Sequence, residues 1–124
     1  MDYEIGSVSV FIVEDEPGLM FVLEESLKSL GYAVGEKAEH LPEALERAQS
    51  EDFDVAMLDV NLHGQDSFPV ADLLVERGIP FVFTTGMGAK TLPERFKLTP
   101  VMEKPYRLKD IQRVISELHP ATSA

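Results

Sequence analysis

Four short polar groups with residue types suited to chemistry each follow an apolar run of the chain. Together they supply three carboxylates, one hydroxyl and one ammonium group: Glu14, Asp15, Asp59, Thr85 and Lys104. Clustered carboxylates repel one another and stay ionised only at a high cost unless a cation joins them. Oxygen ligands without histidine or cysteine favour a hard cation, so this set predicts Mg²⁺, with Mn²⁺ as a substitute.

The same set of residues suits phosphoryl transfer. A carboxylate can act as a nucleophile toward phosphorus and form an aspartyl phosphate. Phosphoryl transfer needs charge neutralisation and positioning more than covalent assistance. A cation, the ammonium group of Lys104 and a hydroxyl donor would supply both, provided that the fold brings the four groups together.

The elements that would position these groups are short β-rich runs that alternate with amphipathic stretches. Strands are predicted over 8–13, 32–37, 54–59, 81–85 and 99–103. Helices are predicted from Pro17 to Gly31, from Pro42 onward, and over 67–77 and 107–118. The stretch from Ala89 to Leu98 contains Pro93, so a short or irregular fourth helix is expected there. Strand starts that recur about every 20–26 residues suit strand–helix–strand crossovers, which predicts a doubly wound (βα)5 α/β fold.

This fold would bring the polar groups to one place. Ligands of open α/β sheets bind beyond the carboxyl ends of the strands, where all four groups would lie. Each group alone has an ordinary structural explanation, because a short acidic run is commonly a solvated turn and a lone aspartate commonly caps a turn. Four such coincidences at four strand ends are far less common, so a shared site is the better interpretation.

Composition excludes several classes of protein. The chain has 124 residues, a formal net charge of −11 and no cysteine. The negative charge disfavours binding to nucleic acids and to anionic membranes, and the missing cysteines exclude thiolate chemistry and disulfides. Neither a signal peptide nor a long apolar run is present, so we expect a cytoplasmic protein with one domain over 1–124 and a core over about 8–119.

The motifs VEDEP, LDVNL, TTG and EKP resemble the four signatures of the response-regulator receiver domain, in the same order along the chain. The resemblance covers residues 8 to about 119 and implies a flavodoxin-like five-stranded parallel sheet with strand order 2-1-3-4-5. It implies that Asp59 accepts a phosphoryl group from a phosphohistidine and also contacts Mg²⁺. By the same resemblance Asp15 binds the metal directly, Glu14 acts through water, and Asn61 offers its backbone carbonyl.

The resemblance also assigns the remaining site residues. Thr85 and Gly86 would bind the phosphoryl group and report it by moving, and Lys104 would pair with it. The bond between Lys104 and Pro105 would be cis, and this bond sets the direction of the chain. The sequence departs from the family at His63, where proline is common, at Gly86, where alanine is usual, and at Val101, where an aromatic residue is usual. With FTTG, these departures resemble a subgroup of standalone alphaproteobacterial receivers that have a Phe-Ala-Thr-Gly-like motif.

The sequence therefore predicts a standalone, phosphorylation-controlled switch or relay, not an enzyme. Its partners would be a histidine kinase or histidine phosphotransferase and an unknown downstream protein, and the chain would be a monomer or weak homodimer. No output domain is expected after Leu118, and the segment from Thr84 to Thr99 is the candidate two-state element. The main alternative is a degenerate receiver that binds partners without phosphorylation. A metal-dependent phosphatase and a flavodoxin-like cofactor binder fit less well, because the chain lacks a lid insertion and a phosphate-binding loop.

Some apolar residues at the start of the first predicted helix are not needed for the predicted core. The run LMFVL over 19–23 is apolar all round the start of the first predicted helix, and a single buried stripe does not need Met20 and Phe21. These two residues are candidates for docking a partner's helical bundle, unless the whole helix is buried. His63 is expected to face solvent and is assigned no ligand role, and His40 and His119 are interpreted as incidental residues at helix ends.

Overall fold

The computed structural model describes residues 8–86 and 92–120. Five parallel strands form one sheet in the order β2-β1-β3-β6-β7, which confirms the predicted order 2-1-3-4-5. The strands are β1 Ser9–Val13, β2 Ala33–Ala38, β3 Val55–Asp59, β6 Phe81–Thr85 and β7 Val101–Glu103. A separate two-stranded antiparallel hairpin consists of β4 Asn61–Leu62 and β5 Gln65–Asp66.

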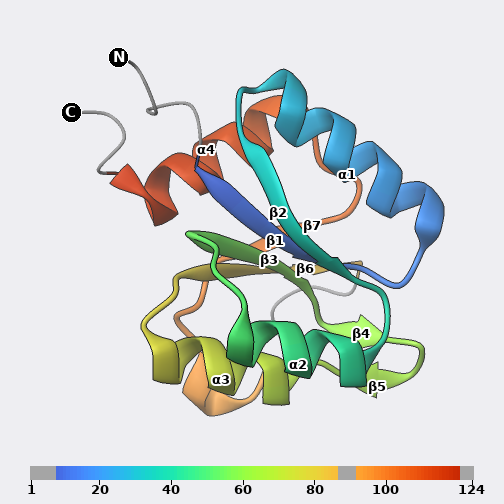
Figure 1. Ribbon diagram of the computed structural model, residues 1–124, viewed down its shortest axis with the longest axis vertical. Helices are drawn as coiled ribbons and strands as arrows, with labels where there is room; N and C mark the ends of the chain where they lie inside the picture. The colour runs from blue at the N-terminus through green and yellow to red at the C-terminus, as the bar shows by residue number, and fades with distance from the viewer. Residues whose placement is uncertain (1–7, 87–91, 121–124) are drawn as a thin grey trace.

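Four α-helices cover the two faces of the sheet. They are α1 Pro17–Ser29, α2 Leu41–Ser50, α3 Phe68–Arg77 and α4 Leu108–Leu118. Helices α1 and α4 lie on one face and α2 and α3 on the other (Figure 1). A proline occupies the first or second position of α1, α2 and α3, where its missing N–H costs no helical hydrogen bond. Within the described ranges, none of the helices is long and apolar enough to cross a membrane.

The core has two layers, one on each face of the sheet. Every residue of β3 and β6 is buried, as expected for central parallel strands that are covered on both sides. Met57 packs with the α1 and α4 side, whereas Phe81 and Phe83 pack with the α2 and α3 side. The prediction that these three residues belong to the core is confirmed.

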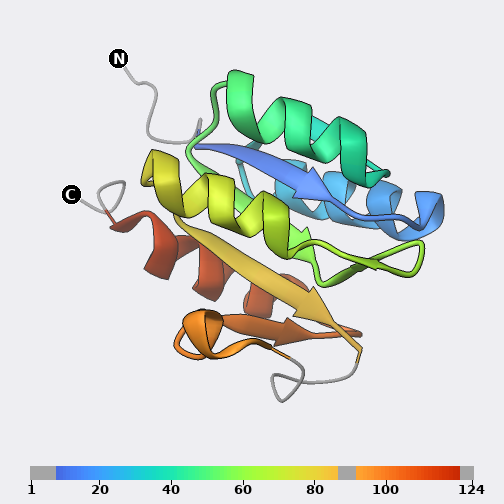
Figure 2. The ribbon, with the colours of Figure 1, turned by 90° about the horizontal axis from the view of Figure 1, so that it is seen from below.

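The connection between β6 and β7 is described only in part. A 3₁₀ turn, η3 Glu94–Phe96, is the helical element described there, and residues 87–91 of the predicted fourth helix lie outside the described residues. Phe96 is buried and packs against the rings of Phe68, Phe81 and Phe83, with centroids 5.4–6.2 Å apart. Figure 2 shows this turn beside β7 at the edge of the sheet. Aromatic packing therefore holds η3 against the α2 and α3 side of the core.

The structure corrects half of the predicted docking patch. Met20 is only 5% exposed and packs in the core with Leu23 and Leu27, three and seven residues further along α1. These spacings place the three side chains on one face of the helix, so Met20 belongs to the buried stripe and the docking prediction for it is wrong. Phe21 and Val22 are 62% and 54% exposed and remain on the surface.

We expect Phe96→Ala to lower the free energy of unfolding by about 3–5 kcal/mol, because it deletes a buried ring from the aromatic cluster. The control is Leu98→Ala, since Leu98 is 97% exposed and its truncation should change stability by less than about 0.5 kcal/mol. Urea unfolding followed by circular dichroism measures both variants. Equal stability of the two variants would contradict the packing of η3 described above.

Candidate functional site

The candidate site lies where four parallel strands end at the same edge of the sheet. Asp59 is the last residue of β3 and Thr85 the last of β6, while Glu14 follows β1 and Lys104 follows β7. Backbone hydrogen bonds continue the sheet past the strand ends, from Glu14 N to the Ala38 carbonyl and from Lys104 N to the Thr85 carbonyl, each at 3.0 Å. The sheet itself thus fixes the backbone from which these side chains project.

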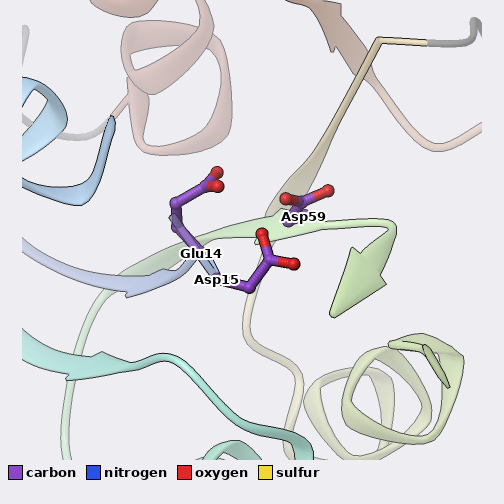
Figure 3. A group of neighbouring side chains, drawn as sticks. All are labelled: Glu14, Asp15 and Asp59. Carbon is purple, nitrogen blue, oxygen red and sulfur yellow. The ribbon is translucent and has the colours of Figure 1, made fainter. Parts of the chain in front are cut away.

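Three carboxylates meet at this edge. Glu14, Asp15 and Asp59 each place an oxygen within 4.8 Å of the other two, and Figure 3 shows the three groups gathered beyond the ends of β1 and β3. Glu14 is fully buried and Asp59 is 5% exposed. Because little water reaches them, the repulsion among the three groups is only weakly screened.

Lys104 is the cation that faces these carboxylates. Its Nζ lies 3.0 Å from Asp59 Oδ2 and 3.3 Å from Glu14 Oε1. Burial lowers the pKa of Lys104, but the hydrogen bond and charge of Asp59 and the charge of Glu14 outweigh it, so the pKa is raised. Lys104 therefore stays protonated, and the next peptide bond, to Pro105, is cis as the resemblance implies.

Backbone donors of the β4–β5 hairpin hold the two aspartates. Asn61 N donates to Asp59 Oδ1 at 3.2 Å, and His63 N donates to Asp15 Oδ2 at 2.8 Å. The side chain of Asn61 accepts a hydrogen bond from Gly64 N at 2.8 Å, so it closes the turn of the hairpin. Sequence analysis missed this hairpin, although the pair His63–Gly64 is a two-residue turn with glycine in second place.

Glu14 has an unsatisfied buried oxygen. Its Oε2 accepts a hydrogen bond from Glu16 N at 3.2 Å, whereas Oε1 has no partner in hydrogen-bond geometry among the described residues and meets Lys104 only as an ion pair. Burial, together with the charge of Asp59, raises the pKa of Glu14 to about 7. An unsatisfied buried oxygen and an excess of negative charge are what a divalent cation would satisfy, so the donor set fits Mg²⁺ or Mn²⁺.

A cavity of about 570 Å³ opens onto this cluster. The predicted residues that line it are Asp15, Asp59, Asn61, Thr85, Gly86 and Lys104, and Phe68 forms an apolar part of the wall. Glu14 lies behind these residues, buried beneath the cavity. A Cβ added at Gly86 would meet no described atom within 4 Å, so the alanine that is usual in the family would fit there. The cavity offers carboxylates, an ammonium group and a hydroxyl to one ligand.

Comparison with known proteins decides the family. The family model for the response regulator receiver domain matches residues 10–116. The chain belongs to this family. Receiver domains belong to two-component signalling systems, and the match confirms the family that the four sequence motifs indicated. No similar sequence was found among the curated proteins.

Solved structures of receiver domains have the same fold. The solution structure of SdrG from Sphingomonas melonis is 36% identical, with a TM-score of 0.80 over 91% of this chain and 97% of SdrG. The PhyR receiver domain of Erythrobacter litoralis is 27% identical, with a TM-score of 0.79 over 92% of this chain and 91% of that domain. A receiver domain of a Pseudomonas aeruginosa sensor histidine kinase, with magnesium coordinated in its active-site cleft, is 22% identical. Its TM-score is 0.78 over 90% of this chain and 97% of that domain, and at this identity it shows the fold alone.

Val101 and Tyr106, near Lys104, pack on opposite faces of the sheet. Val101, where receivers usually have an aromatic residue, is half-buried and packs against the core on the α2 and α3 side. Tyr106 packs on the opposite side, and its hydroxyl is buried without a hydrogen-bond partner among the described residues. Burial and the charges of Glu14 and Asp59 raise the pKa of Tyr106. The position of Tyr106, two residues after Lys104, could have indicated an aromatic side chain near the carboxylates, but the sequence analysis did not consider it.

The raised pKa of Glu14 predicts how the affinity of this site for a divalent cation should change with pH. Protons compete with the cation for Glu14, so the affinity for Mg²⁺ should rise about tenfold per pH unit below pH 7 and level off above it. In Glu14→Gln this pH dependence should be lost. Isothermal titration calorimetry between about pH 6 and 8 measures the affinity and the protons released.

The free energy of unfolding of the metal-free protein checks the raised pKa of Glu14 independently. It should fall as pH rises, whereas the affinity for Mg²⁺ should rise. Because folding raises the pKa of Glu14 from 4.5 to about 7, the neutral form favours the folded state. This contribution is complete below pH 4.5 and is lost as pH rises toward 7, and Glu14→Gln should remove that loss. Identical pH profiles for the wild type and Glu14→Gln, in affinity and in stability, would contradict the assignment.

Proposed function

We propose that this receiver domain is an Mg²⁺-dependent phosphoryl acceptor, with Asp59 as the accepting residue and Mn²⁺ as a substitute cation. The observation that carries the proposal is the environment of the Asp59 carboxylate. Lys104 holds its Oδ2 at 3.0 Å and the Asn61 amide holds its Oδ1 at 3.2 Å. Asp59 also faces an open cavity beside two further carboxylates, so a phosphate donor can reach it.

The reaction moves one phosphoryl group from nitrogen to oxygen. An Asp59 oxygen attacks the phosphorus of a phosphohistidine, the P–O bond forms as the P–N bond breaks, and the imidazole nitrogen keeps the electron pair. Asp15, the backbone carbonyl of Asn61 and Asp59 would hold the cation directly, and Glu14 would hold it through water. When bound, the cation neutralises charge on the transferring oxygens.

The chain's own residues bind the product. Lys104 leaves Asp59 Oδ2 and pairs with a phosphoryl oxygen, because the carboxylate that held it has become an acyl phosphate. The hydroxyl of Thr85 and the backbone N–H of Gly86 donate to the other oxygens from the end of β6. Pro105 sets the direction of the chain after Lys104. Solution structures of SdrG include a BeF3-activated conformation, from a protein 36% identical to this chain, which supports this response to a phosphoryl group.

The added charge then drives a switch. Phosphorylation replaces the single negative charge of the Asp59 carboxylate with a phosphoryl group that carries about two, and the expected two-state element runs from Thr84 to Thr99. Its residues 87–91 lie outside the described residues. In the described remainder, Arg95 binds Asp72 of α3 through two hydrogen bonds of 2.9 and 3.0 Å. This contact anchors η3 to α3 and would have to break or shift for the element to move.

The signalling role follows from this chemistry. A cytoplasmic histidine kinase or histidine phosphotransferase would supply the phosphoryl group, and a downstream protein would read the change on the surface of a single receiver unit. The degenerate receiver, which binds partners without phosphorylation, is the alternative, and Val101 favours it because the usual aromatic residue of the switch is missing. Phosphorylation of the purified protein separates the two.

We expect one phosphoryl adduct when the protein is incubated with acetyl phosphate and Mg²⁺, and none without the metal. Asp59→Asn should abolish the adduct, because the amide is a poor nucleophile. The control Asp66→Asn changes another aspartate that lines the cavity and should keep it. Intact mass spectrometry measures all three proteins, and absence of an Mg²⁺-dependent adduct on the wild type would favour the degenerate receiver.

Phe21 remains the candidate for partner docking after Met20 is assigned to the core. Phe21→Ala should slow phosphotransfer from a phosphohistidine protein and leave phosphorylation by acetyl phosphate unchanged, since only a protein donor contacts α1. Val75→Ala is the matched control, because Val75 is 61% exposed on α3. Transfer rates for each donor are compared by gel or mass analysis, and an equal slowing with both donors would refute docking at Phe21.

A further inference from the structure

The turn of the β4–β5 hairpin has an unusual residue in a demanding backbone conformation. His63 and Gly64 have φ angles of 52° and 84°, and they connect Leu62 to Gln65. Two positive φ angles in a two-residue loop are typical of a type I′ turn, which Asn-Gly, Asp-Gly and Gly-Gly favour. A residue other than glycine is uncommon at positive φ, so the left-handed turn at His63 gains from any support that its surroundings provide.

This turn controls one carboxylate of the candidate site. The backbone N–H of His63 donates a 2.8 Å hydrogen bond to Asp15 Oδ2, across 48 positions of the sequence. The bond fixes the orientation of the Asp15 carboxylate and therefore the directions in which its oxygens can meet a cation. The direction of the N–H depends on the left-handed turn, so the turn sets where the Asp15 carboxylate lies.

The side chain of His63 has a partner that can support the turn. Its ring stacks on the ring of His40, with centroids 4.8 Å apart and planes at 20°. His40 is the residue before α2, and its side chain makes no capping hydrogen bond to that helix. The stack therefore ties the hairpin to the junction of β2 and α2. This junction contributes no carboxylate to the cluster of Glu14, Asp15 and Asp59.

We propose that His40 is a positioning residue for the cation site. Its ring holds His63 in the left-handed turn, and the N–H of the turn aims Asp15 at the cation. The inference rests on the proposed function, because it takes Asp15 as a ligand of a divalent cation. It places a determinant of cation affinity on an exposed ring that lies outside the cavity and never touches the metal.

The first test uses the metal-free protein and measures the hydrogen bond itself. Exchange of the His63 amide hydrogen, followed by NMR, should be several-fold faster in His40→Ala than in the wild type. His119→Ala removes the remaining histidine of the chain, at the end of α4, and should leave this exchange unchanged. Because no metal is present, the result does not depend on the proposed function.

The second test measures Mg²⁺ affinity by calorimetry at one fixed pH. His40→Ala should bind about three- to tenfold more weakly, which is the effect of losing one ordinary hydrogen bond. His63→Ala keeps the N–H but removes the ring and does not favour the left-handed turn, so it should weaken binding to a similar extent. If the two rings act as a unit, the double variant should be no weaker than either single variant.

The outcomes separate this inference from the proposed function. Unchanged amide exchange and unchanged affinity in His40→Ala would overturn the inference, and so would losses that add in the double variant. Faster exchange together with coupled losses of affinity would support it. A wild type that binds no Mg²⁺ would overturn the cation role and the proposed function together, whereas failure of the His40 variants alone would leave the proposed function standing.

Discussion

Electrostatic repulsion among three carboxylates is the constraint on which this structure depends. Glu14, Asp15 and Asp59 lie within a few ångströms of one another, and among the described residues Lys104 is the one cation at hydrogen-bonding or ion-pair distance from them. In isolation such a cluster would separate or become neutral, because buried like charges are costly. Here the carboxylates extend from neighbouring parallel strands whose backbone hydrogen bonds continue past Glu14 and Asp59, so they cannot move apart without breaking the sheet.

The same constraint makes the site responsive. A cation, or a proton on Glu14, relieves part of the excess negative charge, whereas a phosphoryl group on Asp59 adds to it. Each of these changes alters what Lys104 can bind. Lys104 follows β7, a three-residue strand at the edge of the sheet. On the other side of the cavity Phe68 contacts both Phe83 and Phe96, so the apolar wall connects the site to η3. These contacts connect the strand ends, where the charges lie, to the edge of the fold that the switch hypothesis requires to move.

Sequence reasoning reached the five-stranded fold and the polar residues that meet at the strand ends, because both depend on patterns that are local in the chain. Continuous apolar runs marked β1, β3 and β6, and prolines marked the starts of three helices. It failed at the β4–β5 hairpin, because two-residue strands have no hydrophobic period to detect. It also failed at Met20, because an apolar helix start does not show how much of its circumference neighbouring elements cover.

The sequence alone determined which chemical groups this receiver domain has and the order in which its strands present them, since residue types and alternation are properties of the chain. Only the tertiary structure decided the distances that give these groups a function. The contact of His63 N with Asp15, the stack of His40 on His63 and the buried hydroxyl of Tyr106 all join residues from different elements. The packing of the sheet against its loops fixes such contacts, and no spacing along the chain encodes them.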